Sequence, residues 1–135
     1  MVGYFTLALK VLFIRRTPAL NNKMRTRLLR FSQVNNEMNG YEISAPLIAQ
    51  LGKNYTNNYR KLITGDELLN IACEKVRSIQ SIAGSKIAYL ECQDKPVLTK
   101  LYTENGFIEF DRRQLDAKER TKLGCDYLLQ MLRYF

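Results

Sequence analysis

The feature that most constrains the fold is the segment from Ser44 to Phe107, which predicts a strand, a helix and a second strand. The first strand is the apolar run at Tyr41–Leu51, and the second is the run at Lys86–Cys92. Strands joined by such a helix pair in parallel through a right-handed crossover. Pro46 within the first strand requires an edge, a bulge or a local break. A phosphate-bearing ligand prefers the loop and helix start that follow the first strand, so we expect the functional site there.

The helix between these strands has sequence signals at both ends. Thr64 and Glu67 form a capping-box pattern at its start, and Gly84 ends it. Backbone N–H groups at a helix start bind phosphate, and Arg60 and Lys61 add positive charge just before it. Many surface helices that bind nothing begin in the same way, so spacing alone leaves both interpretations open.

The opening strand at Val2–Ile14 is apolar on both faces. This pattern predicts an interior strand of a sheet that is covered on both sides. An interior strand needs two neighbours, and nothing precedes this one in the sequence, so we expect an exposed apolar edge. A homodimer or a partner chain would cover that edge.

The composition indicates one globular domain that spans residues 1–135. Of these residues, 46% are hydrophobic and 25% are charged, and no apolar run reaches the ~18 residues that a membrane span needs. The chain has no histidine, which excludes Ser-His and Cys-His nucleophile pairs and most zinc sites. Its three scattered cysteines suit the reduced thiols of a cytoplasmic protein. We therefore expect no membrane association and no metal site.

The net charge of +8 is concentrated near the N-terminus. Residues 15–30 contain no acidic residue and six basic ones, which are Arg15, Arg16, Lys23, Arg25, Arg27 and Arg30. Such a segment attracts polyanions: nucleic acid, an anionic membrane surface or a phosphorylated cofactor. The alternative is a solvated surface without a ligand.

Several segments resemble the GNAT-superfamily N-acetyltransferases. Residues 100–107, KLYTENGF, look like the fourth helix of that family, and the preceding YLECQD looks like its fifth strand. LIAQLGK, residues 47–53, resembles the fourth strand, whose backbone holds the pantetheine arm of acetyl-coenzyme A (acetyl-CoA). RKLITGDELL, residues 60–69, is similar to the pyrophosphate-binding loop, with Ile63 in place of its first glycine. The opening GYFTLALKVL resembles the third strand of members close to the toxins of toxin–antitoxin pairs.

The resemblance implies a mixed, mostly antiparallel twisted sheet with a central parallel strand pair and flanking helices. This is an α/β or α+β domain of GNAT type that lacks the family's N-terminal strands and helices. It also implies acetyl-CoA as cofactor, bound by the strand end and the loop through Leu51, Gly52, Lys53, Arg60, Lys61, Leu62, Ile63, Thr64, Gly65 and Asp66.

The resemblance assigns Tyr102 to protonating the departing thiolate, a task that suits a phenol with an ordinary pKa of ~10. By periodicity alone, Tyr102 is instead a packing residue of a short amphipathic helix. Glu42 and Glu91 are weaker candidates for the general base that takes a proton from the amine. A water chain is the alternative to either carboxylate.

We therefore expect an N-acetyltransferase that moves an acetyl group from acetyl-CoA to a primary amine. The basic segment and the toxin-like opening favour the amino group of aminoacyl-tRNA as acceptor, with protein and small-molecule amines as alternatives. A second interpretation is a catalytically inactive GNAT remnant that binds nucleic acid or a partner protein through residues 15–30. The missing N-terminal part favours this second interpretation, and the loop together with Tyr102 favours the first.

Overall fold

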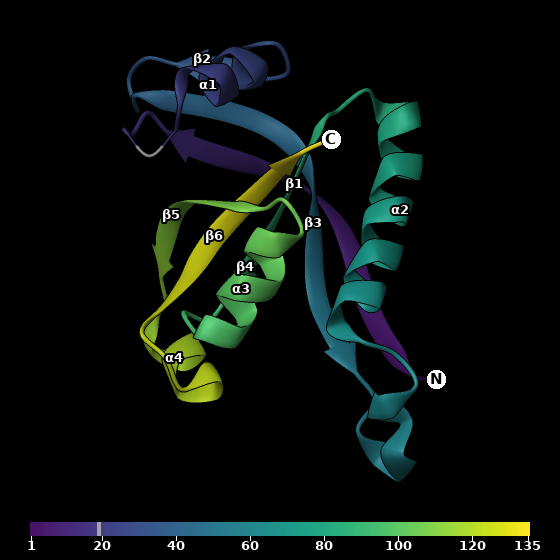
Figure 1. The fold of residues 1–135 in the computed structure, drawn as a ribbon. Helices are drawn as coiled ribbons and strands as arrows, with labels where there is room; N and C mark the ends of the chain where they lie inside the picture. Colours follow the sequence, from purple (N-terminus) through teal and green to yellow (C-terminus); the bar gives the residue numbers. More distant parts are fainter. Residues whose placement is uncertain (19) are drawn as a thin grey trace.

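The computed structural model describes residues 1–18 and 20–135, which form one curved sheet with helices packed on it (Figure 1). In chain order the elements are β1 (Gly3–Arg15), α1 (Asn22–Leu29), β2 (Gln33–Asn35), β3 (Gly40–Lys53), the 3-10 turn η1 (Thr56–Lys61), α2 (Gly65–Ala83), β4 (Ile87–Cys92), α3 (Pro96–Glu104), β5 (Ile108–Gln114), α4 (Ala117–Leu123) and β6 (Tyr127–Tyr134). The strands and the helix of the predicted central unit are β3, α2 and β4.

The strands pair in the order β1-β3-β4-β6-β5, and β2 pairs with the first residues of β3. Neighbouring strands are antiparallel except β3 and β4, which are parallel. The prediction of a mixed, mostly antiparallel sheet with a parallel pair and flanking helices is confirmed. Within residues 1–18 and 20–135, no helix combines the length and the apolar character that a membrane crossing needs.

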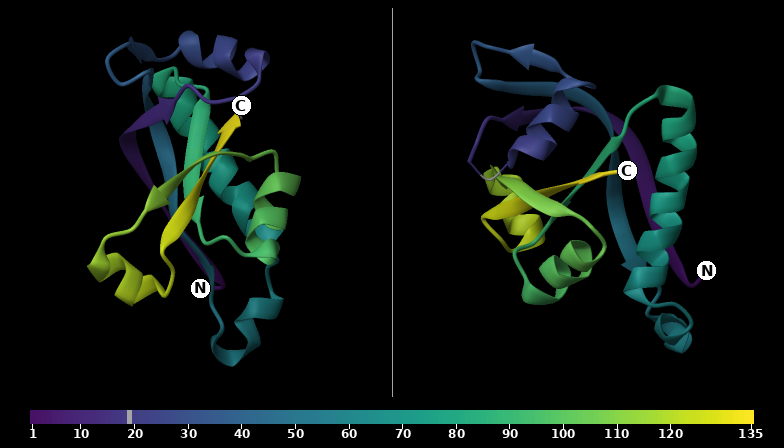
Figure 2. Two further views of the ribbon diagram at one scale, coloured as in Figure 1. Left: turned by 90° about the vertical axis from the view of Figure 1, so that its left-hand side faces the viewer. Right: turned by 45° about the horizontal axis from the view of Figure 1, so that its top comes forward.

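Each face of the sheet carries its own hydrophobic core. On one face, Leu69 of α2 and Tyr102 of α3 pack with Leu90 of β4. On the other face, Met24 and Leu28 of α1 pack on the sheet at the end where β3 begins. Figure 2 shows α1 and β2 gathered at the end of the sheet that lies away from η1. Since the first four residues of β4 are buried on both faces, this part of its sequence is a continuous apolar run, Ile87–Leu90.

The prediction that β1 is an interior strand is wrong. β1 comes first in the strand order and pairs with β3, so it forms an edge of the sheet. Its first half packs Phe5 and Leu7 on the α2 side, whereas its second half packs Leu12 and Ile14 on the α1 side. Because the covered face changes along the strand, apolar residues occupy both faces, and Leu9 between the two halves is 65% exposed. A homodimer or partner chain that covers this edge stays a prediction.

The parallel pair is short, and a β-bulge follows it. β3 pairs with β4 through Leu47 and Ile48, and beyond them the two strands separate. Directly after these residues β3 has one residue more than β1 opposite it. Gln50 in this bulge has a left-handed backbone with a φ of 52°, which costs a non-glycine residue about 1–2 kcal/mol. The bulge therefore marks the point where the sheet opens.

Pro46 lies just before the paired residues without breaking the strand. The N–H of Arg16 donates to the carbonyl of Asn39, which shows that odd-numbered residues of this part of β3 face β1. The missing N–H of Pro46 therefore faces the other edge, at a position between the residues that pair with β2 and those that pair with β4. Of the three solutions predicted for this proline, the structure uses a locally free edge.

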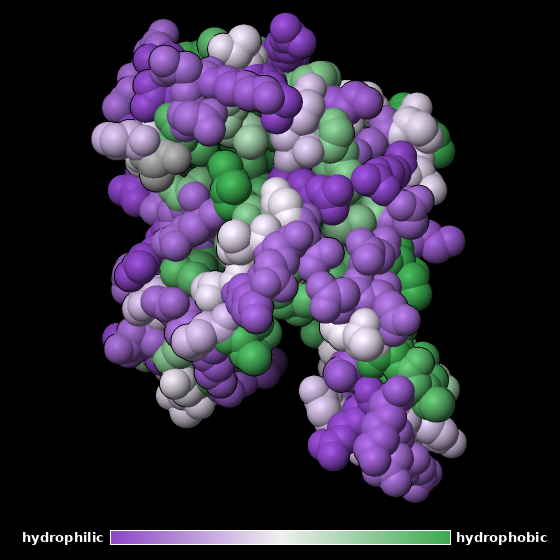
Figure 3. Space-filling model, viewed as in Figure 1, coloured by the Kyte–Doolittle hydropathy of each residue, from purple (hydrophilic) through white to green (hydrophobic). Residues whose placement is uncertain are grey.

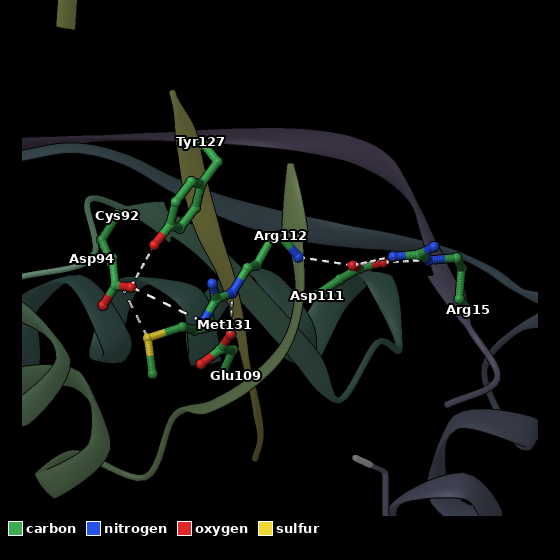
Figure 4. A network of polar contacts seen from close by, with 8 residues as sticks. All are labelled: Arg15, Cys92, Asp94, Glu109, Asp111, Arg112, Tyr127 and Met131. Carbon is green, nitrogen blue, oxygen red and sulfur yellow. Dashed lines mark hydrogen bonds and ion pairs between the residues drawn. The ribbon is translucent and has the colours of Figure 1, made fainter. Parts of the chain in front are cut away.

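An ion pair joins the two edge strands of the sheet at one corner. Arg15, at the end of β1, donates from Nε to Oδ2 of Asp111 on β5 over 2.7 Å, as Figure 4 shows. Asp111 also accepts the backbone N–H of Arg112 at 2.8 Å. The hydrogen bond from Arg15 is the main reason that the pKa of Asp111 is lowered. The sheet is thus curled far enough for its first and last strands to meet.

The bulge gives a prediction about stability. We expect Gln50→Val to lower the free energy of unfolding by about 1–2 kcal/mol, because a β-branched side chain fits the left-handed region poorly. Gln50→Gly removes this conflict and should change stability by less than about 1 kcal/mol. Urea unfolding of both variants checks the prediction, and equal stabilities would contradict the left-handed bulge.

Candidate functional site

A cleft of about 490 Å³ opens where β3 and β4 separate. Its walls are the end of β3 at Leu51–Lys53, the start of α2 at Gly65 and Asp66, and the face of α3 that carries Tyr102. Figure 3 shows the surface hollowed between α3 and the protruding η1 turn. The structure thus brings together six of the residues that the sequence assigns to one site.

The β3 wall presents backbone N–H groups to the cleft. Asn54 donates its N–H to the carbonyl of Val2, so even-numbered residues face β1 after the bulge. By alternation, the N–H groups of Leu51 and Lys53 point away from β1, towards the side where β4 has separated. Backbone donors on a free strand edge suit the amide and carbonyl groups of an extended ligand.

Gly52, between these two donors, lies directly against a neighbouring side chain. A Cβ atom at this position would lie 2.8 Å from the hydroxyl oxygen of Tyr4 on β1. The glycine in this strand is therefore explained by packing against Tyr4, although its sequence position also predicts close approach of a ligand.

The start of α2 leaves backbone donors free. Thr64 and Glu67 form the predicted capping box, in which the Glu67 carboxylate accepts the Thr64 N–H at 2.7 Å and the Thr64 hydroxyl accepts the Glu67 N–H at 3.1 Å. The N–H groups of Gly65 and Asp66, in the first turn, have no acceptor among the described residues. These N–H groups and the positive end of the helix dipole favour an anion at the cleft.

Asp66 is held by the neighbouring helix. Its carboxylate accepts the side-chain N–H of Asn105, at the end of α3, over 2.8 Å. This bond fixes the start of α2 against α3 and gives the carboxylate a partner. The same contact fixes the position of the two helical walls of the cleft relative to each other.

The other predicted loop residues lie outside the cleft walls. Arg60 and Lys61 end the η1 turn, and they are exposed together with Leu62 and Thr64, while Ile63 is half-buried. The left-handed conformations of this connection fall on Asn57 and Asn58, with φ of 51° and 60°. Asparagine tolerates this region, whereas isoleucine at position 63 does not. The turn therefore forms earlier in the chain, and η1 projects beyond the end of β3 (Figure 1).

Tyr102 lies in the cleft wall with its side chain 7% exposed. Its ring packs edge-on against Phe107, with the ring centroids 6.1 Å apart. Burial, with a smaller contribution from Cys92, raises the pKa of Tyr102 to about 12. The phenol therefore keeps its proton throughout the neutral range and acts there as a hydrogen-bond donor.

The two carboxylates considered as bases lie in different places. Glu42 is nine residues before Leu51 on β3, roughly 30 Å along the strand, where it accepts a hydrogen bond from Asn35. Glu91 lies beside the point of separation, because Leu90 pairs with Ile48. Successive residues of a strand point to opposite faces, so Glu91 lies on the face opposite Cys92 and Tyr102. The geometry therefore removes Glu42 from the site and keeps Glu91 near it.

Glu91 already has a partner on its own face of the sheet. Nε of Arg113 on β5 donates to its carboxylate at 2.6 Å, and the same guanidinium contacts Glu119 of α4 at 3.2 Å. This three-residue cluster ties β4, β5 and α4 together next to the separated strands. It also fixes the direction of the Glu91 carboxylate.

A polar network anchors the segment between β4 and α3. The hydroxyl of Tyr127 donates to Asp94 at 2.7 Å, and Arg112 approaches the same carboxylate at 4.0 Å while bonding Glu109 (Figure 4). Asp94 does not cap α3, because Lys95 holds the N-cap position, without a side-chain hydrogen bond. Asp94 instead fixes the loop that leads from the centre of the sheet to Tyr102.

Several cleft residues were missed by reasoning from the sequence. Val97, Lys100, Leu101 and Glu104 of α3 line the cleft, and so does the exposed ring of Tyr55. The spacing of the four α3 residues places them on one helical face, adjacent to Tyr102. This periodicity was the available signal for the α3 residues.

The comparisons with known proteins add no name to this site. A scan of protein-family models finds none that matches the chain, and a search of curated proteins finds no similar sequence.

Two buried acids beside the cleft predict sensitivity to alkali. Burial raises the pKa of Tyr102 to about 12 and that of Cys92 to about 11, so both hold their protons more tightly in the folded state. Stability is therefore full below pH ~9 and is lost as the pH rises through ~9–12, by about 2–3 kcal/mol for each group. Urea unfolding at pH 8 and pH 11 measures the loss. Tyr102→Phe should reduce it, and an unchanged loss would contradict the burial of this phenol.

Proposed function

We propose that this chain is a GNAT-type N-acetyltransferase, which transfers an acetyl group from acetyl-CoA to a primary amine. The observation that carries the proposal is the cleft, which gathers the end of β3, the start of α2 and Tyr102 around one space. These are the three parts that the resemblance assigns to the pantetheine arm, the pyrophosphate and the leaving sulfur. They include residues as far apart in sequence as Leu51 and Tyr102, and the fold brings them to the walls of one cleft.

The chemistry of the walls fits this cofactor. The free N–H groups of Gly65 and Asp66 would hold the pyrophosphate, and Lys53 adds a positive charge at the mouth. The N–H groups of Leu51 and Lys53 would hold the amides of the pantetheine arm. When bound, acetyl-CoA supplies an activated thioester. Position in the cleft then converts a bimolecular reaction into one between held groups.

Tyr102 would act at the leaving sulfur. In the transfer, the amine nitrogen forms a bond to the acetyl carbon, the carbon–sulfur bond breaks, and the sulfur leaves as a thiolate. A phenol with a pKa of about 12 is a weaker acid than a thiol, whose pKa is ~8.5. Tyr102 therefore stabilises the thiolate mainly as a hydrogen-bond donor, and solvent protons complete the protonation.

Glu91 marks the side from which the amine would arrive. Tyr102 and α2 occupy one face of the separated strands, and Glu91 lies on the opposite face. An amine that approaches from that second face meets the Glu91 carboxylate before the gap. Because Glu91 is bonded to Arg113, it would orient the ammonium group or accept its proton through a water molecule.

Binding is the first test, and Gly65 offers a sharp variant. Isothermal titration calorimetry should show acetyl-CoA binding by the intact chain. Gly65→Ala should weaken binding at least about tenfold, because the methyl group would block close approach of a phosphate. The fold should tolerate this change, since the new Cβ atom would lie 3.5 Å from Leu101, an ordinary contact. If no binding is seen at millimolar acetyl-CoA, the acetyltransferase proposal is wrong, and the interpretation as a catalytically inactive protein remains.

The second test concerns the role of Tyr102. Tyr102→Phe should lower kcat about 100-fold, because the donor to the leaving sulfur is lost, while acetyl-CoA affinity changes little. Tyr41→Phe is the matched control, since Tyr41 is also buried but lies near the start of β3, away from the cleft. The rates are measured as acetyl transfer to a panel of amines, monitored through the release of free thiol. Equal losses in the two variants would remove Tyr102 from this role.

A further inference from the structure

The positive charge of this protein is gathered around α1. Residues 1–40 contain seven lysines and arginines and one acidic residue, Glu37. α1 packs on the sheet through Met24 and Leu28, Arg25 and Arg27 are half-buried, and the other residues of this short helix are exposed. The N-cap residue Asn21 fixes its start by accepting the N–H of Met24 at 2.8 Å. The helix is therefore a fixed support for the basic side chains around it.

Two of the basic residues near α1 are engaged within the protein. Arg15 forms the ion pair with Asp111, and Arg25 donates to the carbonyl of Thr17 at 2.8 Å. Four others form no ion pair with any acidic group in the described part of the chain: Arg16, Lys23, Arg27 and Arg30. We refer to these four residues as the α1 basic surface.

Aromatic rings hold two of these groups in fixed directions. The guanidinium carbon of Arg16 lies 5.4 Å from the ring centroid of Tyr41, and that of Arg27 lies 4.3 Å from the ring of Tyr134. Such stacking fixes a guanidinium and leaves its N–H groups to solvent. These arginines therefore form an ordered cationic surface, in contrast to Arg112 and Arg113, which are both bonded to carboxylates.

We propose that the α1 basic surface binds the phosphate backbone of double-stranded nucleic acid without reading its sequence. Fixed guanidinium groups without internal acidic partners match closely spaced phosphates in charge and hydrogen bonding. A single strand would also need exposed rings on which bases stack. The rings of this surface lie beneath the guanidinium groups, and Tyr41 is 3% exposed. The geometry therefore favours a duplex, whose bases are already stacked.

The surface is separate from the cleft. In Figure 1, α1 lies at one end of the sheet, and η1 lies at the other. The cleft is lined by Leu51–Lys53, at the end of β3 that leads into η1, and by no residue of α1. Figure 3 shows hydrophilic residues over α1 at the top and the hollow at the bottom. Duplex binding thus does not depend on the acetyltransferase proposal, and saturating acetyl-CoA should leave the duplex affinity unchanged. A loss of duplex binding on adding acetyl-CoA would place the duplex in the cleft and overturn the assignment to α1.

Salt dependence gives a quantitative test of this surface. Fluorescence anisotropy with a labelled 20-base-pair duplex should show Kd on the order of 10⁻⁴–10⁻⁶ M near physiological salt, with log K falling against log salt at a slope of about −3.6 for four phosphate contacts. Lys23→Gln and Arg30→Gln, at exposed side chains that pack on no ring, should each reduce the slope by about 1. Slopes that stay unchanged in both variants would overturn the proposal.

A matched charge control separates this surface from general attraction. One variant changes Arg16, Lys23, Arg27 and Arg30 to Gln, and the control changes Lys75, Lys118, Arg120 and Lys122 to Gln. Each set removes four positive charges and lowers the net charge from +8 to +4. The first variant should lose at least about tenfold in duplex affinity, and the control should lose less than about threefold. Equal losses would show that overall charge alone attracts the duplex.

Two further comparisons keep the result unambiguous. Arg16→Lys with Arg27→Lys retains the charge while removing the stacked guanidinium groups, so it should weaken duplex binding and leave the salt slope near that of the unchanged protein. Tighter binding of a single strand of equal length would overturn the choice of a duplex. Binding to vesicles of anionic phospholipid in the absence of duplex binding would assign the surface to a membrane instead.

Discussion

The separation of β3 from β4 is the constraint on which the rest of the structure depends. Two paired residues, Leu47 and Ile48, hold the parallel strands together, and the bulge at Gln50 then turns β3 away. This opening leaves backbone N–H groups of β3 without a strand partner. In a continuous sheet, these groups would form hydrogen bonds with β4. It also leaves a space that α2 and α3 enclose from one side. The left-handed conformation of Gln50, at a modest energetic cost, thus accompanies the opening of a cleft in an otherwise continuous sheet.

The parts of the fold that the sequence predicted well are those with local signals. The capping box at Thr64, Gly84 at the end of α2 and the apolar run of β4 depend on neighbouring residues, and their predicted bounds agree with the structure to within one residue. The position of β1 depends on which helix covers each half of it, and Phe5 and Ile14 read alike in a sequence although they are buried on opposite faces. Edge and interior therefore could not be distinguished.

The candidate site shows the same division. Gly65, Asp66 and Tyr102 lie together in the cleft, as predicted. Their placement could be predicted because helix starts and helix faces follow from residue spacing. The loop from Arg60 to Ile63 lies outside the cleft walls. The position of its turn depends on which residues accept a left-handed backbone, and Asn57 and Asn58, earlier in the chain, adopt that conformation. Glu42 and Glu91 are both acidic strand residues. Their different distances from the cleft follow from strand register, which a single sequence does not contain.

The ion pair between Arg15 and Asp111 also limits where a further strand can pair with the edge of the sheet. β1 is an edge strand, but its last residues are turned in towards β5, and Leu12 and Ile14 are buried there. The accessible edge is the part from Gly3 to Val11, which spans roughly 30 Å. Any further strand, whether from another part of a longer polypeptide or from another molecule, therefore finds room for about nine residues. It must end or bend away before reaching the corner that Arg15 closes.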